Sequence, residues 1–194
     1  MISIFLLGDS IRKYYEERLK ELLGEEYAVY APTENCKFST LTLNSLKTWL
    51  SEVPTPQIVH WNNGLWDAAR VYPEDGCFTP LEQYESNLRK ILRELKKTGA
   101  KIIFATTTPT DPKKAQEHEG MNIHHNEDIK LYNEVALKVM QENDVIINDL
   151  YSIVNGKESE FIRQDDLIHP TEIGVEALAQ QVASKIQVVA KTIK

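Results

Sequence analysis

Short apolar runs alternate with longer amphipathic segments along the chain, and this alternation constrains the fold more than any other feature of the sequence. The opening run, residues 2–7, fits a buried strand and is too short for a helix or a membrane span. We expect strands at residues 2–7, 27–30, 57–61, 101–105 and 145–147. Because helical segments separate these runs, the strands are predicted to form βαβ units and a parallel sheet.

The segments between the strands show the apolar periodicity of helices. One of them has a clear start, since Thr79 can cap it, Pro80 suits its first turn and Glu82 completes a capping box. We expect helices at residues 12–23, 40–50, 80–97, 126–142, 149–154 and 171–189. Five strands with helices between them predict an α/β fold of three layers, α/β/α, and a single domain over residues 1–194.

Charge and composition exclude several classes of protein. The net charge is -7 and no basic patch is evident, which argues against binding to nucleic acid or to an anionic membrane. The N-terminus has no basic segment before its apolar run and no small-residue cleavage site after it, so we expect a cytoplasmic protein. Cys36 and Cys77 are far apart and follow no metal-ligand spacing, which favours two reduced thiols.

Two short motifs near opposite ends of the chain carry the chemistry. Gly8-Asp9-Ser10 follows the first predicted strand, and active sites of open α/β sheets lie in the turns after strands. Asp166-Leu167-Ile168-His169 precedes the last predicted helix. A serine hydroxyl becomes a nucleophile when a histidine takes its proton and a carboxylate orients that histidine. The two motifs therefore predict a catalytic triad of Ser10, His169 and Asp166.

Each of these residues also has a simpler role open to it. Ser10 alone is typical of a helix N-cap, and His169 alone of a residue fixed at a helix start. Asp165 competes with Asp166 as the acid, but it stands four residues before the histidine rather than three. Asp9 is expected to shape the turn and bond nearby backbone groups. The presence of both motifs in one chain favours the catalytic roles.

On these motifs the sequence resembles the SGNH (GDSL-like) hydrolase family, whose members open with Gly-Asp-Ser and close with Asp-x-x-His. The resemblance spans nearly the whole chain and leans toward the carbohydrate acetylesterases of the family. It implies a flavodoxin-like sheet of five parallel strands in the order 2-1-3-4-5, and a mechanism without a cofactor. The Gly-x-Ser-x-Gly elbow of α/β-hydrolases is absent.

The resemblance also implies donors for the oxyanion that develops in acyl transfer. One is the Ser10 N–H. The family shows Gly-x-Asn-Asp after the third strand, where this chain has Trp61-Asn62-Asn63-Gly64, so Asn63 takes the role and Asn62 is the alternative. The family's glycine donor after the second strand has no counterpart, and Cys36 is its nearest positional equivalent. The local backbone must then avoid a conformation that only glycine tolerates.

Aromatic and polar residues around the third block are candidate substrate contacts. They are Trp61, Asn62, Trp66, Asp67 and Arg70. Aromatic rings beside polar groups suit a sugar or another polar acyl acceptor, although a packed surface loop would show the same composition. The histidines and glutamates between residues 117 and 125 follow no metal motif, so we predict a solvated loop that could cover the site, and no metal.

These observations predict a serine esterase that removes small acyl groups, foremost acetyl, from a hydroxylated small molecule such as a carbohydrate. A lysophospholipase or an acyl-thioesterase of the same family is the alternative enzyme. A non-catalytic binding module on the same scaffold is the alternative outside enzymes, because fold alone does not define function. Against that module, no dinucleotide-binding or Walker-type glycine loop follows any predicted strand.

Overall fold

The computed structural model describes residues 1–116 and 123–193, and these residues build one parallel sheet of five strands. The strands are β1 (Ile2–Leu7), β2 (Tyr27–Tyr30), β3 (Ile58–Trp61), β4 (Lys101–Ala105) and β5 (Ile146–Asn148). Their order is β2-β1-β3-β4-β5, and every neighbouring pair is parallel. The expected α/β class and strand order are confirmed.

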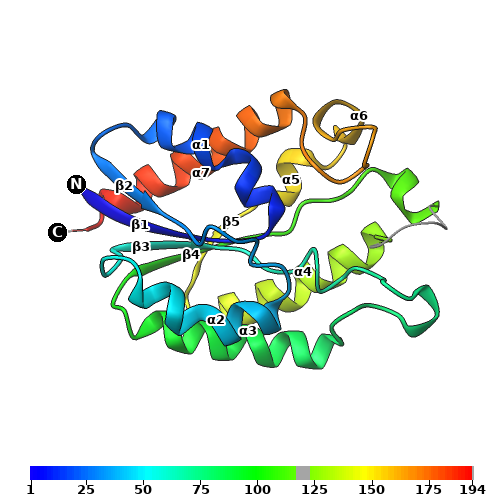
Figure 1. Cartoon of the computed structure of the whole chain (residues 1–194), viewed down its shortest axis with the longest axis horizontal. Helices are drawn as coiled ribbons and strands as arrows, with labels where there is room; N and C mark the ends of the chain where they lie inside the picture. The colour runs from blue at the N-terminus through cyan, green and yellow to red at the C-terminus, as the bar shows by residue number, and fades with distance from the viewer. Residues whose placement is uncertain (117–122, 194) are drawn as a thin grey trace.

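Helices cover both faces of this sheet (Figure 1). One face carries α1 (Ser10–Leu23) and α7 (Glu172–Ala190), which pack against each other, with the short helices α5 (Tyr151–Val154) and α6 (Glu158–Phe161) beside them. The other face carries α2 (Ser39–Ser51), α3 (Leu81–Lys96) and α4 (Asn126–Gln141). The expected three-layer arrangement is therefore confirmed.

The central strands are buried on both faces, as parallel strands between helical layers must be. All four residues of β3 and the last four of β1 are buried. On β3, the fully buried Trp61 meets the ring of Phe104 edge-on, with ring centroids 5.1 Å apart. This contact packs the end of β3 against the end of β4.

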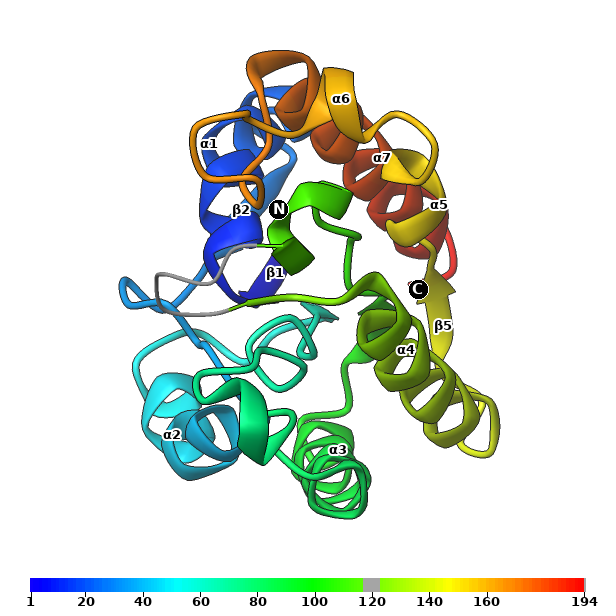
Figure 2. The ribbon, with the colours of Figure 1, turned by 90° about the vertical axis from the view of Figure 1, so that its right-hand side faces the viewer.

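The carboxyl ends of β1 and β3 lie side by side. Leu7 is the register partner of Trp61, and the N–H of Asn62 donates to the Leu7 carbonyl at 3.1 Å. Gly8 and Asn62 therefore leave the sheet next to each other. Figure 2 views the molecule from this end, where the start of α1, the loop before α7 and the loops after β2 and β3 converge. Both sequence motifs are thus brought to one edge of the sheet.

Two local expectations differ from the structure. Thr79 does not cap α3; the N-cap is Pro80, which makes no side-chain cap bond. The Thr79 N–H instead donates to the Asp67 carbonyl at 3.1 Å, and its side chain bonds the Asp67 carboxylate. The second difference is α6, a single helical turn in a segment for which the sequence predicts no helix.

Within residues 1–116 and 123–193, no helix combines the length and the apolar character that a membrane crossing requires.

Candidate active site

Asp9 and Ser10, at the start of α1, have different roles. Asp9 is the N-cap, and its Oδ1 accepts a hydrogen bond from the Ile11 N–H at 2.9 Å. Burial raises the pKa of this carboxyl, although the Ile11 N–H and the charge of Arg12 work in the opposite direction. The structural role expected for Asp9 is confirmed. Because Asp9 caps the helix, the Ser10 hydroxyl is not used for capping.

Ser10, His169 and Asp166 form a hydrogen-bonded chain. The Ser10 Oγ lies 2.9 Å from His169 Nε2, and His169 Nδ1 lies 3.0 Å from Asp166 Oδ2. With the imidazole proton on Nδ1, this nitrogen donates to the carboxylate and Nε2 accepts from the hydroxyl. Ser10 and His169 are half-buried, so the hydroxyl remains open to a ligand. The structure brings together the three residues that the two motifs single out.

Asp166 is held by backbone donors as well as by the imidazole. Its Oδ1 accepts from the N–H groups of Ile168 and His169 at 2.9 and 2.8 Å. Burial alone would raise the pKa of Asp166, but these N–H groups and His169 outweigh it and lower the pKa. The carboxylate therefore stays charged at neutral pH. Asp165 is exposed and pairs with Arg163 instead, so it does not contact the histidine.

Two further residues contact this chain and were not predicted. The ring of Tyr14 stacks on the imidazole of His169, with centroids 4.7 Å apart and planes 20° apart. Arg163 Nη1 donates to the Tyr14 hydroxyl at 3.1 Å. A sequence signal for Tyr14 existed, because it stands four residues after Ser10 and so lies above it on the same helix face. For Arg163 there was none.

Asn63, the expected oxyanion donor, is fully buried and already bonded within the protein. Its Oδ1 accepts from the Trp61 indole N–H at 2.7 Å. Its Nδ2 donates to the Lys37 carbonyl at 3.1 Å and to the Thr42 hydroxyl at 3.0 Å. Both amide hydrogens thus have protein acceptors, and the structure does not present Asn63 to a ligand.

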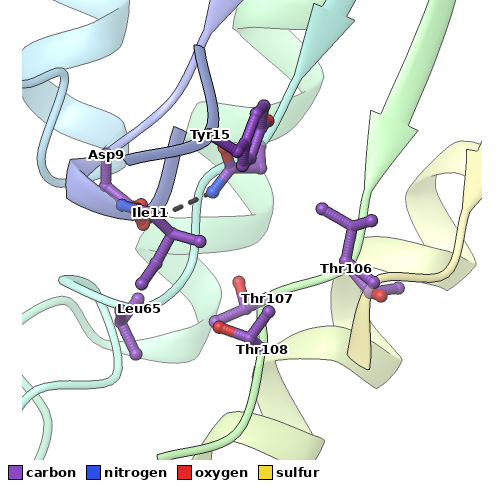
Figure 3. A pocket seen from close by; sticks show the side chains of 9 residues that line it. Asp9, Ile11, Tyr15, Leu65, Thr106, Thr107 and Thr108 are labelled. Carbon is purple, nitrogen blue, oxygen red and sulfur yellow. Dashed lines mark hydrogen bonds between the residues drawn. The ribbon is translucent and has the colours of Figure 1, made fainter. Parts of the chain in front are cut away.

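Asn62, the alternative donor, supports the Gly8–Asp9 turn. Its Nδ2 donates to Asp9 Oδ2 at 3.3 Å. Its Oδ1 lies so close to Gly8 that a Cβ on this glycine would come within 2.1 Å of it, which explains why the motif needs glycine here. Figure 3 shows Asp9 at one wall of a small cavity that Asn62 also lines, with Thr107 and its neighbours across from Asp9. The cavity measures about 10 Å³, too little for a substrate.

Cys36 does not fill the role of the family glycine. Its backbone N–H donates to the Gly8 carbonyl at 3.2 Å, which ties the loop after β2 to the end of β1 but leaves no free donor. The next residue, Lys37, has a φ of 46°, in the left-handed region that favours glycine. Its N–H donates to Asn35 Oδ1 at 2.9 Å. The glycine-like position is therefore Lys37 rather than Cys36.

Of the five residues expected to contact substrate, Trp66 and Arg70 are partly exposed. Trp61 and Asp67 are fully buried and Asn62 is nearly so. Trp61 packs in the core, and the Asp67 carboxylate accepts from the Ser39 N–H and hydroxyl. The ammonium of Lys37 lies 5.3 Å from the centre of the Trp66 ring. Trp66 and Lys37 thus form an accessible aromatic and cationic pair on the loops after β3 and β2.

The histidine-rich loop, for which the sequence predicts a cover over the site, lies partly outside the described residues, which exclude residues 117–122. His124 is buried, and its Nε2 lies 3.1 Å from the Leu65 carbonyl. Arg70 is tied to Asp128 through an ion pair of 2.8 Å. In the part of the chain that the structure describes, no three histidine, cysteine or carboxylate side chains are grouped as metal ligands would be.

A model of a known protein family matches most of the chain. The model of the GDSL-like Lipase/Acylhydrolase family matches residues 6–177. No curated protein sequence matches the chain.

Similar solved structures include the acetyl xylan esterase AlAXEase, at 18% identity and a TM-score of 0.76, covering 95% of this chain and 100% of that one. The lipase/acylhydrolase from Enterococcus faecalis is 21% identical, with a TM-score of 0.76 over 96% of this chain and 95% of that one. Axe2, an acetylxylan esterase from Geobacillus stearothermophilus, is 18% identical, with a TM-score of 0.75 over 95% and 94%. At these identities the likeness shows a shared fold.

The family model covers most of the chain, including Ser10 and His169. The chain belongs to the GDSL-like lipase/acylhydrolase family and is a carboxylic ester hydrolase.

Proposed function

We propose that this protein is a serine esterase in which Ser10 is the nucleophile, His169 the general base and Asp166 the residue that orients His169. The observation that carries the proposal is the chain of two hydrogen bonds, 2.9 and 3.0 Å long, that joins the three side chains. This is the arrangement that activates a serine hydroxyl in unrelated hydrolases. Asp166 is held in its charged form, as the orienting role requires.

The steps follow from the positions of the atoms. His169 Nε2 takes the hydroxyl proton as Ser10 Oγ attacks the ester carbonyl, and the charge on the imidazolium is balanced by Asp166. The proton then passes to the leaving alcohol, which departs and leaves an acyl group on Ser10. A water molecule, deprotonated by the same nitrogen, releases the acid and restores the serine.

The oxyanion requires donors, and Ser10 supplies the first. Its N–H belongs to the first turn of α1, whose N–H groups have no acceptor within the helix. Asn63 remains our second donor, on condition that the Lys37 carbonyl turns away from its amide. That turn would free one amide hydrogen for the developing charge.

The preferred substrate is a small acyl ester, foremost an acetyl ester, of a carbohydrate. Trp66 and Lys37 support this choice, because a partly exposed indole beside a cation suits a polar ring that carries hydroxyl groups. The similarity to two acetylxylan esterases points the same way.

One feature favours the alternative of a longer acyl chain, as in a lysophospholipase or an acyl-thioesterase. A surface groove of about 480 Å³ runs beside His169, and Tyr14, Pro170 and Val175 line part of it. Its other walls carry Arg18, Arg163, Glu172 and Glu176. The surface that this groove exposes is largely apolar, which suits a chain of methylene groups.

The test is hydrolysis of p-nitrophenyl acetate, butyrate and octanoate by the wild type and by Ser10→Ala, His169→Ala and Asp166→Asn. We expect acetate to be the best ester, and each triad variant to lose about 10³-fold or more in kcat. The matched control is Ser51→Ala, which changes an exposed serine at the end of α2 and should keep full activity. Circular dichroism would verify that all variants are folded.

Two results would contradict the proposal. Activity retained in Ser10→Ala or His169→Ala would show that hydrolysis does not depend on the triad. An inactive wild type whose Ser10 also fails to react with a fluorophosphonate would favour the binding module. Preference for octanoate would keep the mechanism and move the substrate to the lipid or thioester class.

A further inference from the structure

Tyr14 is placed to act on the catalytic base rather than on the fold. It is an exposed residue, with 39% of its surface accessible, so it adds little to the core. Its one ring contact among the described residues is the stacked imidazole of His169. Stacking at 4.7 Å and 20° leaves no room for the imidazole to swing toward that side.

The Tyr14 ring is itself fixed at both ends. At its backbone it stands on α1, one turn after Ser10, so the nucleophile and the ring move as one rigid element. At its hydroxyl it accepts a hydrogen bond from Arg163, 3.1 Å away. Arg163 belongs to the loop that carries His169, because its own N–H donates to the His169 carbonyl at 2.9 Å.

Arg163 in turn is held beside the acid of the triad. Its guanidinium pairs with Asp165, and its Nε lies 3.8 Å from Asp166 Oδ2. One chain of contacts therefore runs from α1 through Tyr14 and Arg163 to the loop with Asp166.

We propose that Tyr14 is a positioning residue, which holds the His169 imidazole in the orientation that keeps Nε2 on the Ser10 hydroxyl, with Arg163 fixing the Tyr14 ring. This inference rests on the proposed catalytic roles of Ser10 and His169. Tyr14 does not touch the reacting carbonyl. Its effect falls on the proton-transfer steps and leaves substrate binding unchanged.

The test compares Tyr14→Phe, Tyr14→Leu and Tyr14→Ala on p-nitrophenyl acetate. Displacing a catalytic group by about 1 Å can lower a rate by 10²-fold, so we expect Tyr14→Ala to lose about 10- to 100-fold in kcat with KM changed by less than about threefold. Tyr14→Phe keeps the ring and loses only the bond to Arg163, and should stay within about threefold of wild type. Tyr14→Leu keeps bulk without a flat ring and should resemble Tyr14→Ala.

A second measurement excludes an effect through substrate binding or folding. The rate at which a small fluorophosphonate labels Ser10 depends on the serine and its base, and it should fall in Tyr14→Ala by the same factor as kcat. Glu17→Ala, an exposed position on the same helix, is the control for helix stability and should change neither rate. Thermal unfolding would show that each variant is folded at the assay temperature.

The proposal is overturned if Tyr14→Ala keeps its kcat and labelling rate, or if Tyr14→Phe loses as much as Tyr14→Ala. Failure of the proposed function looks different. In that case the wild type itself neither hydrolyses an ester nor reacts at Ser10, whatever residue stands at position 14.

Discussion

At the scale of single residues, Lys37 holds a backbone conformation that its own side chain makes unfavourable. Its φ of 46° brings Cβ close to the following carbonyl, which costs about 1 kcal/mol or more in any residue but glycine. The contact of the Lys37 ammonium with the Trp66 ring offsets part of this conformational cost. Lys37 is therefore strained at the place where its carbonyl bonds the Asn63 amide.

We expect Lys37→Gly to be more stable than Lys37→Ala by about 1 kcal/mol, because both lose the contact with Trp66 and only glycine relieves the backbone. Urea denaturation of the two variants measures the difference, and neither depends on the wild-type side chain. Equal stabilities, or a more stable alanine variant, would show that position 37 is not strained.

The sequence singled out the three side chains that the structure joins by hydrogen bonds, but not the contacts of the expected oxyanion donors. Ser10, Asp166 and His169 were recognisable because their chemistry needs particular residue types at short spacings. A backbone N–H has no residue type, so Cys36 and Lys37 were indistinguishable in the sequence. Likewise, Asn62 and Asn63 carry the same amide, and which contacts each one makes depends on Trp61, Thr42 and the loop after β2.

At the scale of elements, Asp67 joins the loop after β3 to the start of α2. Helix α2 has no side-chain cap of its own, and its N-cap is Phe38. Asp67, 28 residues away in the sequence, caps the helix instead. Its carboxylate accepts from the Ser39 N–H at 3.0 Å and from the Ser39 hydroxyl at 2.7 Å. A negative charge at this end of a helix also interacts favourably with the helix dipole.

Burial nevertheless raises the pKa of Asp67 from 3.8 to about 6, although the bonds from Ser39 and Thr79 act to lower it. A carboxyl whose pKa is higher in the folded state stabilises the fold when protonated. The contribution of Asp67 to the free energy of unfolding is therefore complete below about pH 4 and is lost as the pH rises through about 6.

We therefore expect the free energy of unfolding of the wild type, relative to Asp67→Asn, to be greater at pH 4.5 than at pH 7 by about 2 kcal/mol. Urea denaturation at the two pH values measures it. Asp75→Asn, an exposed carboxyl on the same loop, is the control and should show no such change. A difference that is the same at both pH values would mean that Asp67 titrates normally in the folded protein.

Element positions and the ends of three strands were predictable from apolar spacing, whereas most helix starts were not. The expected strand at residues 2–7 is β1 itself, and the helix expected from residue 12 begins at Ser10. Local rules placed a cap at Thr79 because threonine, proline and glutamate are typical there. The structure uses Thr79 to bind Asp67, a contact between segments that a local pattern does not contain.

At the scale of the whole molecule, the centre of the sheet holds an uncharged histidine. His60 on β3 is fully buried, and its Nε2 lies 3.1 Å from the Asn148 amide nitrogen on β5. Burial lowers the pKa of His60 from 6.5 to about 3. The folded protein therefore resists protonation of His60. The contribution of the neutral imidazole to the free energy of unfolding is complete above about pH 6.5 and is lost as the pH falls toward 3.

We expect acid to destabilise the wild type more than His60→Gln, whose amide oxygen can accept from Asn148 without titrating. Between pH 8 and pH 4.5 the wild type should lose about 3 kcal/mol relative to this variant, which is opposite in sign to the effect at Asp67. Chemical denaturation across this range is the measurement. Parallel curves for the two proteins would show that His60 is protonated as readily as in water.

The architecture was the most predictable level, because it depends on many residues at once. Alternation of strands and helices limits the chain to a parallel sheet with covered faces, and no single side chain decides it. The strand order came from the resemblance carried by Ser10 and His169, and the structure confirms it. Contacts such as His60 with Asn148 follow from that order and were not visible before it was known.

The two ends of the triad also set the time at which this protein becomes active. Ser10 and His169 are 159 positions apart, so the ribosome makes the serine long before it makes the histidine. Under the proposed mechanism a growing chain carries its serine without reactivity until α7 has emerged and docked on α1. By the same mechanism, a nascent chain would hydrolyse no ester before His169 has been made and has folded onto Ser10.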